Sequence, residues 1–295
     1  MLSRALLEAR EALSSGESAK FVTHRELIDE LLSRVEVTQP PESVIGDLVR
    51  SLAVARDAGA DDDRRAALVD VVGIVARQLA PSDEPAADPA IQAVWRELLG
   101  AADRLYGAGV VSLGRLPFVS DRLLELLVAE AGLELVDRPD GGARVSGRAG
   151  QALATLAFSR KLAQTVGAAL GGCVVANQRA SYHYDPPGSH VRTHVDARSH
   201  ELIFHMILEH DLPHDGAPGS ALVAHLPGRP GPQRLWLHPG EAVALSGRGT
   251  IHSWEQLRDG ERRTLIGIGF ERRTEVQSRG RRAHVGEHPA SELAY

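Results

Sequence analysis

Apolar residues recur at three- and four-residue steps along the first 107 residues, which is the spacing of amphipathic helices. This pattern predicts five helices, over residues 3–13, 24–35, 41–59, 61–80 and 88–107. The acidic run at residues 61–63 lies at the N-cap and first turn of the fourth helix, where carboxylates interact favourably with the positive end of the helix dipole. A short connector rich in proline and aspartate follows at residues 81–89, so we expect the helical part to pack on the rest of the chain.

The pattern changes after residue 107. We expect a strand over residues 109–116, a helix over 119–132, a strand over 133–138 and one long helix over 147–170 that ends at Gly171. Short apolar runs separated by proline and glycine then occupy residues 173–184, 201–210, 220–227, 234–238, 241–247 and 263–272. Short strands at regular spacing are typical of a β-sandwich or a barrel.

These changes divide the chain into three parts. Residues 1–107 form a helical region that serves as a lid, a dimerisation surface or a scaffold, and residues 108–275 form the strand-rich domain. Residues 276–295 lack periodicity and are interpreted as a tail. A homodimer remains one of the open alternatives.

Composition narrows the choice of partners. The chain has 295 residues and a net charge of -6, so it lacks the basic excess of proteins that bind nucleic acid or anionic membranes. Cys173 is its one cysteine, which excludes an internal disulfide, and we expect no signal peptide in the alternating apolar and charged residues 1–20. A cytoplasmic protein that acts on small molecules is the favoured interpretation.

Candidate chemistry gathers in the stretch "YHYDPPGSHVRTHVD", residues 182–196. His194 and Asp196 are two residues apart, so in an extended segment their side chains emerge on the same face. His252 lies farther along, after an apolar strand and a glycine-rich turn. Two histidines and one carboxylate form the facial triad of non-haem Fe(II) oxygenases, which leaves coordination positions open for other ligands.

Other histidines fit a metal site less well. His200 and His205 are five residues apart in a strand-like run and would point to opposite faces, and Pro213 interrupts the run from His210 to His214. We therefore reject both pairs as zinc sites. His183 and His190 are interpreted as surface or hydrogen-bonding residues.

The segment "GERRTL" offers a cation after the distal histidine. Arg262 shares a strand face with Thr264, and the apolar residues that follow suggest burial, which costs free energy unless an anion pairs with the arginine. A bound carboxylate would supply that partner in a two-point contact. Arg263 points to the opposite face, so a one-residue bulge would exchange the two arginines; we favour Arg262.

Five successive segments together resemble a known family: "YDPPGSHVRTHVD", "LIFHMILEH", "GSALVAHLP", "HPGEAVALSGRGTIHSW" and "DGERRTLIGIGF". They are similar to the elements of the 2-oxoglutarate/Fe(II)-dependent dioxygenases, particularly the prolyl-hydroxylase-like branch, over residues 110–272. The resemblance implies an α+β fold with a double-stranded β-helix core, also called a jelly roll and cupin-like, flanked by helices. It also implies that His194, Asp196 and His252 hold Fe(II).

The same resemblance implies roles for other residues. Arg262 would bind the distal carboxylate of 2-oxoglutarate with help from Thr264, with Arg263 as the alternative, while Tyr184 or Tyr182 would reach the cosubstrate. Weaker candidates for substrate contacts are Arg192, Arg198 and Trp254.

The implied activity is that of an oxidoreductase. The enzyme would use O2 to hydroxylate an unactivated C–H bond of a small molecule, amino-acid-like or a secondary metabolite, and would release succinate and CO2. Asp196 favours hydroxylation over halogenation, because halogenating relatives replace this carboxylate, while desaturation, cyclisation and epimerisation stay open. The alternatives are a peptide or protein hydroxylase and a non-catalytic cupin-like barrel that binds a metal or ligand.

Overall fold

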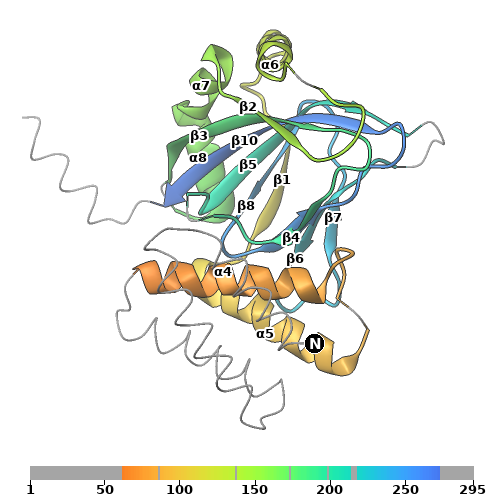
Figure 1. The fold of residues 1–295 in the computed structure, drawn as a ribbon. Helices are drawn as coiled ribbons and strands as arrows, with labels where there is room; N and C mark the ends of the chain where they lie inside the picture. The colour runs from red at the N-terminus through yellow and green to blue at the C-terminus, as the bar shows by residue number, and fades with distance from the viewer. Residues whose placement is uncertain are drawn as a thin grey trace, which may run out of the picture.

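The structure is a computed structural model that describes residues 62–85, 87–136, 138–172, 174–197, 199–213 and 218–272. The first three expected helices, the expected tail, Cys173 and Arg198 lie outside these residues. Two antiparallel sheets and a set of helices make up the described part, which fits the α+β class (Figure 1). None of its helices is both long and apolar enough to cross a membrane.

Two helices come first, as the apolar spacing predicts. They are α4 (Asp62–Leu79) and α5 (Pro89–Tyr106), which lie beside each other and bury their apolar faces in one cluster. That cluster also contains Ile251 and contacts Val195, two residues of the strand-rich part. The helix pair is therefore packed against the sheets, as the short connector suggests.

The large sheet has six strands in the order β1-β8-β5-β10-β3-β2. Their bounds are β1 Val110–Arg115, β2 Val145–Arg148, β3 Val174–Asp185, β5 Leu202–Asp211, β8 Glu241–Leu245 and β10 Arg262–Arg272. The small sheet has the order β4-β9-β6-β7, with β4 Val191–His194, β6 Leu222–His225, β7 Gln233–Leu235 and β9 Ile251–Trp254.

Three helices cover the outer face of the large sheet: α6 (Asp121–Glu134), α7 (Gln151–Ala157) and α8 (Arg160–Leu170) (Figure 1). The central strands of this sheet are therefore apolar on both faces. One face packs on the helices, and the other packs on the small sheet around Leu222, Trp254 and Leu265. A strand buried on both sides shows no alternation of apolar and polar residues.

Two expected elements between residues 133 and 170 are wrong. Residues 133 and 134 belong to the end of α6, so no strand runs over 133–138 in the described part; the strand of this region is β2. The expected long helix is two helices, because the Ser159 side chain accepts a hydrogen bond from the Leu162 amide and begins α8 anew. The expected end is correct: Gly171 follows α8 with a φ of 80°.

Candidate metal centre and its cavity

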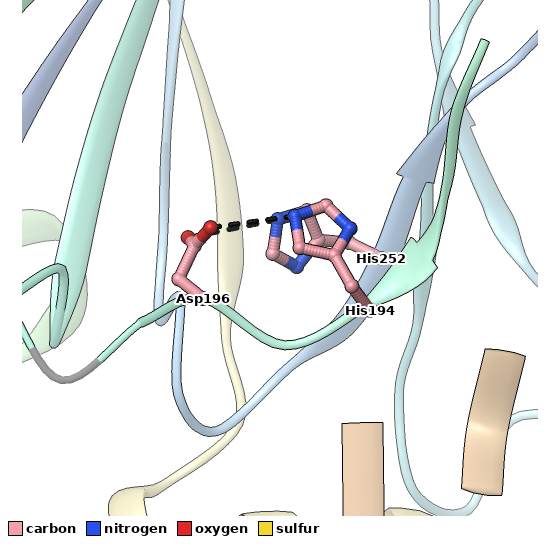
Figure 2. Close-up of side chains that lie close together, drawn as sticks. All are labelled: His194, Asp196 and His252. Carbon is pink, nitrogen blue, oxygen red and sulfur yellow. Dashed lines mark ion pairs between the residues drawn. The ribbon is translucent and has the colours of Figure 1, made fainter. Parts of the chain in front are cut away.

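His194, Asp196 and His252 come together between the two sheets (Figure 2). His194 ends β4, and it pairs in the sheet with His252 of β9. Asp196 follows in the segment after β4, and its amide donates to the Gly247 carbonyl at 2.8 Å. One ligand atom from each side chain lies within 4.8 Å of the other two.

Hydrogen bonds orient both imidazole rings. Nδ1 of His194 donates to the Arg192 carbonyl and Nδ1 of His252 donates to the Thr250 carbonyl, each at 2.8 Å. Because a carbonyl can only accept, the proton sits on Nδ1 and the Nε2 lone pair is left for another partner. The two Nε2 atoms lie 3.4 Å and 3.6 Å from the carboxylate oxygens of Asp196 (Figure 2).

The carboxylate between these rings lacks part of its hydrogen bonding. Asp196 Oδ2 is buried and has no hydrogen-bond partner among the described residues, a condition that costs free energy unless something else satisfies the charge. Burial alone would raise the pKa of Asp196, but His252 and His194 hold it well below its usual range. Burial, followed by the charge of His194, lowers the pKa of His252 to about 4.

These features fit a divalent cation. The site presents an ionised carboxylate and two imidazoles whose Nε2 atoms converge on it, and a cation would satisfy the oxygen that lacks a hydrogen bond. Gly247 leaves room for the Asp196 carboxylate, since a β-carbon at that position would collide with Asp196 Oδ2 and the His200 carbonyl.

Helix α4 supports β4 and the segment after it, which carry His194 and Asp196. The Thr193 hydroxyl donates to the Ala80 carbonyl at 3.0 Å, and a β-carbon at Gly73 would lie 2.8 Å from Val195 Cγ2. Arg248 is fully buried and links α4 to the segment after β4, because its guanidinium donates to the backbone carbonyls of Ala66 and Asp196. Thr193 and Val195 thus face the helix, while His194 and Asp196 face the cavity.

The three side chains line a cavity of about 180 Å³ between the sheets. Residues two apart on the same strand supply much of its wall, as expected for one face of a sheet. The other lining residues are Arg144, Ser181, His183, Val191, His200, Ile203, His205, Trp254 and Gly267. A second cavity, of about 380 Å³, lies near the end of α8, but its lining contains no histidine or acidic residue.

The expected cosubstrate residues of β10 lie elsewhere. Arg262 is not buried: its side chain is 47% exposed and pairs with Asp140 at 3.3 Å. Thr264 is buried, but it shares the strand face of Ile266, Ile268 and Phe270, which packs on α6, α7 and α8. The face of β10 turned toward the small sheet instead carries Arg263, Leu265 and Gly267.

The two tyrosines of β3 also point away from the cavity. Tyr182 and Tyr184 belong to the core beneath the helices, and the Tyr182 hydroxyl donates to Glu130 Oε1 at 2.6 Å. Neither lines the cavity; Ser181 and His183 do. His183, expected to be a surface or hydrogen-bonding residue, is half-buried at the cavity and forms hydrogen bonds with Ser146 and Ser181. Burial, followed by the charge of Arg144, lowers its pKa to about 3.

Of the weaker candidates for substrate contacts, Trp254 lies at the cavity and Arg192 does not. Trp254 lines the cavity, 2% exposed, with its ring 5.7 Å from that of His205. Arg192 is exposed and does not line the cavity, and Arg198 lies outside the described residues. His205, rejected above as a zinc ligand, contributes to the wall, and its Nδ1 has no hydrogen-bond partner among the described residues.

A cluster of three charged residues stands at one end of β3. Asp185 is fully buried and accepts from Arg144 Nε at 2.6 Å, from Arg144 Nη2 at 2.9 Å and from Arg263 Nη2 at 2.8 Å. Burial alone would raise the pKa of Asp185, but the two arginines hold it well below its usual range. Arg144, in the segment before β2, gave no sequence signal as a site residue.

Comparisons with known proteins find similarity in structure only. No family model and no curated protein matches the sequence. A 2OG-Fe(II) oxygenase family oxidoreductase from Burkholderia pseudomallei has 18% identity and a TM-score of 0.43 over 60% of this chain and 90% of its own. A Pseudomonas putida prolyl-4-hydroxylase has 20% identity and a TM-score of 0.40 over 60% of this chain and 100% of its own.

A third similar structure is HygX from Streptomyces hygroscopicus, with nickel and 2-oxoglutarate bound. It has 13% identity and a TM-score of 0.43 over 56% of this chain and 83% of its own. Many of the structural neighbours are thus 2OG-Fe(II) oxygenases, at low sequence identity. Because the likeness is distant, the functional argument rests on the side chains described above.

Proposed function

We propose that this protein is an Fe(II)- and 2-oxoglutarate-dependent dioxygenase that hydroxylates an unactivated C–H bond of a small molecule. The observation that carries the proposal is the convergence of two Nε2 lone pairs on a buried carboxylate with an unpartnered oxygen. Two histidines and one carboxylate are the ligand set of non-haem Fe(II) oxygenases.

We also propose that the two sheets form a double-stranded β-helix. From β3 to β10, strands β3, β5, β8 and β10 join the large sheet, and β4, β6, β7 and β9 join the small one. The chain therefore crosses repeatedly between two facing sheets, the behaviour of a jelly roll. Helix α4 supports β4 from outside, so residues 62–106 are proposed as a scaffold of the barrel and not as a separate lid.

His194, Asp196 and His252 would hold the iron, which supplies O2 activation and the oxidation of the C–H bond when it is bound. The chain itself orients both histidines through their Nδ1 hydrogen bonds. Val191, Ile203 and Trp254 provide apolar wall next to the ligands, which limits the access of water. The protein thus contributes positioning and a partly dry cavity.

The size of the cavity favours small reactants. Drug-sized ligands occupy pockets of about 300–1,000 Å³, whereas this cavity holds about 180 Å³. A small keto acid is the occupant that fits, with the substrate placing its reacting carbon at the opening. The peptide-hydroxylase alternative needs a docking groove formed by the N-terminal helices, and no residue of α4 or α5 lines the cavity.

Anaerobic absorption spectroscopy tests the proposal. Fe(II) and 2-oxoglutarate together are expected to give a weak visible charge-transfer band in the wild type, and His194→Ala or His252→Ala is expected to abolish it. His190→Ala is the matched control, since His190 pairs with Asp83 at 3.0 Å and does not line the cavity. A wild type without the band would refute the proposal.

A metabolite screen for succinate release stimulated by a substrate would then identify the substrate. Metal binding with no succinate from any metabolite would favour the non-catalytic barrel instead. Turnover driven only by peptides would favour the protein hydroxylase.

A further inference from the structure

The cluster of Arg144, Asp185 and Arg263 contains two cations and one anion. Two guanidinium groups share one carboxylate, so the three side chains have a net charge of +1 beside the cavity. A buried cation without its own anion is costly. Burial, followed by the charge of Arg144, also lowers the pKa of His183 and of His205, so these two wall residues add no further positive charge. The acidic residue of the cavity lining, Asp196, belongs to the candidate metal site.

Arg263 is enclosed by protein. It is 1% exposed, its guanidinium lies 4.0 Å from the centre of the Trp254 ring, and it does not line the cavity. Its three nitrogens donate to Asp185 Oδ2 and to the Ser220 carbonyl. Arg263 is thus fixed inside the barrel wall.

Arg144, unlike Arg263, is accessible from the cavity. It lines the cavity together with the three candidate ligands, and its side chain is 19% exposed. Its Nε and Nη2 are bonded to Asp185, while Nη1 has no hydrogen bond to any residue that the structure describes. Asp185 therefore fixes the orientation of the Arg144 guanidinium, and the two N–H groups of Nη1 remain available to a ligand.

We infer that Arg144 binds the distal carboxylate of 2-oxoglutarate, and that Asp185 acts as its positioning residue. The inference rests on the proposed function, and it moves the anchoring cation from strand β10 to the segment before β2. A carboxylate on Nη1 of Arg144 would balance the net charge of the cluster and form a charge-assisted hydrogen bond. Arg262, exposed and paired with Asp140, has no part in this contact.

Binding of two keto acids to the Ni(II)-loaded full chain tests this role without requiring turnover. The probes are 2-oxoglutarate and 2-oxopentanoate, which have the same carbon chain but differ in the distal carboxylate. Isothermal titration calorimetry gives the ratio of their dissociation constants for the wild type, Arg144→Gln, Arg144→Lys and the matched control Arg262→Gln.

The wild type is expected to prefer 2-oxoglutarate by about 10- to 100-fold, the range for a hydrogen bond between charged groups. Arg144→Gln is expected to reduce that preference to within about threefold while its affinity for Ni(II) stays unchanged, and Arg262→Gln is expected to keep it. Arg144→Lys keeps the charge beside Asp185 and should retain part of the preference. Asp185 keeps Arg263 in both Arg144 variants, so the cluster retains one ion pair.

A full preference in Arg144→Gln, or its loss in Arg262→Gln, would overturn the inference while leaving the proposed function intact. A wild type that binds Ni(II) but neither keto acid would overturn both. Thermal unfolding of each variant shows whether an altered ratio belongs to a folded protein.

Discussion

Glu261 provides a stability test that does not depend on any ligand. Its side chain is fully buried in the turn before β10, where it accepts from His210 Nε2 at 2.8 Å, the Ser220 amide at 2.6 Å and the Arg258 amide at 3.0 Å. Burial alone would raise the pKa of Glu261, but these donors lower it from 4.5 to about 2. They join the segment before β6 and the end of β5 to the turn before β10.

The lowered pKa sets the size and sign of the effect. A shift of this size corresponds to about 3 kcal/mol of folding free energy. Because the folded pKa lies below the unfolded value, this stabilisation is complete above pH 4.5 and is lost as the pH falls through about 2. Glu261→Gln removes the charge but keeps the shape, so it is expected to destabilise the protein by about 3 kcal/mol at pH 7.

Urea unfolding of the wild type and Glu261→Gln at pH 7 and pH 3 measures the difference directly. The gap is expected to shrink to about half or less at pH 3, since the unfolded wild type is then protonated at this position. Glu125→Gln is the matched control, because Glu125 is 67% exposed and pairs with Arg122 on the surface of α6, where such pairs contribute less than about 1 kcal/mol. A gap below about 1 kcal/mol at pH 7, or one that does not narrow in acid, would refute the reasoning.

Three further substitutions test the environment of the site. Gly247→Ala is expected to abolish Ni(II) binding in a calorimetric titration, because the new methyl group collides with the Asp196 carboxylate; unchanged affinity would contradict this geometry. Arg248→Met should cost about 3 kcal/mol in urea unfolding, since it removes a buried guanidinium that joins α4 to the Asp196 carbonyl. Tyr182→Phe should cost about 1.5–3 kcal/mol by losing its bond to Glu130 while leaving the dissociation constant of 2-oxoglutarate unchanged. A weaker affinity for 2-oxoglutarate in that variant would restore the role that the resemblance implied for this tyrosine.

The sequence could predict features that depend on local spacing. Apolar steps of three and four residues were enough to find α4 and α5, and the pair at positions 194 and 196 required only two side chains on one face of an extended segment. His252 was predicted as the third ligand because it follows an apolar strand and a glycine-rich turn and completes a set of two histidines and one carboxylate. The first two signals lie within a few residues along the chain, while the third depends on the known ligand set.

The sequence could not show which residues of β3 and β10 point toward the helices and which point toward the small sheet. Helices cover the outer face of the large sheet and the small sheet covers its inner face, so both sets of alternate residues are apolar and the period of two carries no direction. A one-residue difference then exchanges Tyr182 with His183 and Arg262 with Arg263. The size of the side chains was the one sequence feature that distinguishes the two faces of β10. Gly267 lies on the crowded inner face, while Ile266 and Ile268 lie under the helices.

Arg144 shows a different limit. It stands in an irregular segment far from β3 in the sequence, and its place beside Asp185 depends on the pairing of β2 with β3. That strand was not expected, because residues 133–138 offered a stronger apolar run. Contacts created by tertiary pairing leave no pattern in the neighbouring sequence.

The packing of α4 behind β4 bears on how the protein can be dissected. Thr193 and Val195 alternate with His194 and Asp196, so the first pair contacts α4 and the residue after it, while the second pair lines the cavity. A truncated protein that starts at residue 108 would expose Thr193 and Val195 to water. His194 and Asp196 would then no longer be held at a fixed distance from each other. Residue 107 therefore marks a change of secondary structure, but it is a poor place to separate the two sheets from α4 and α5.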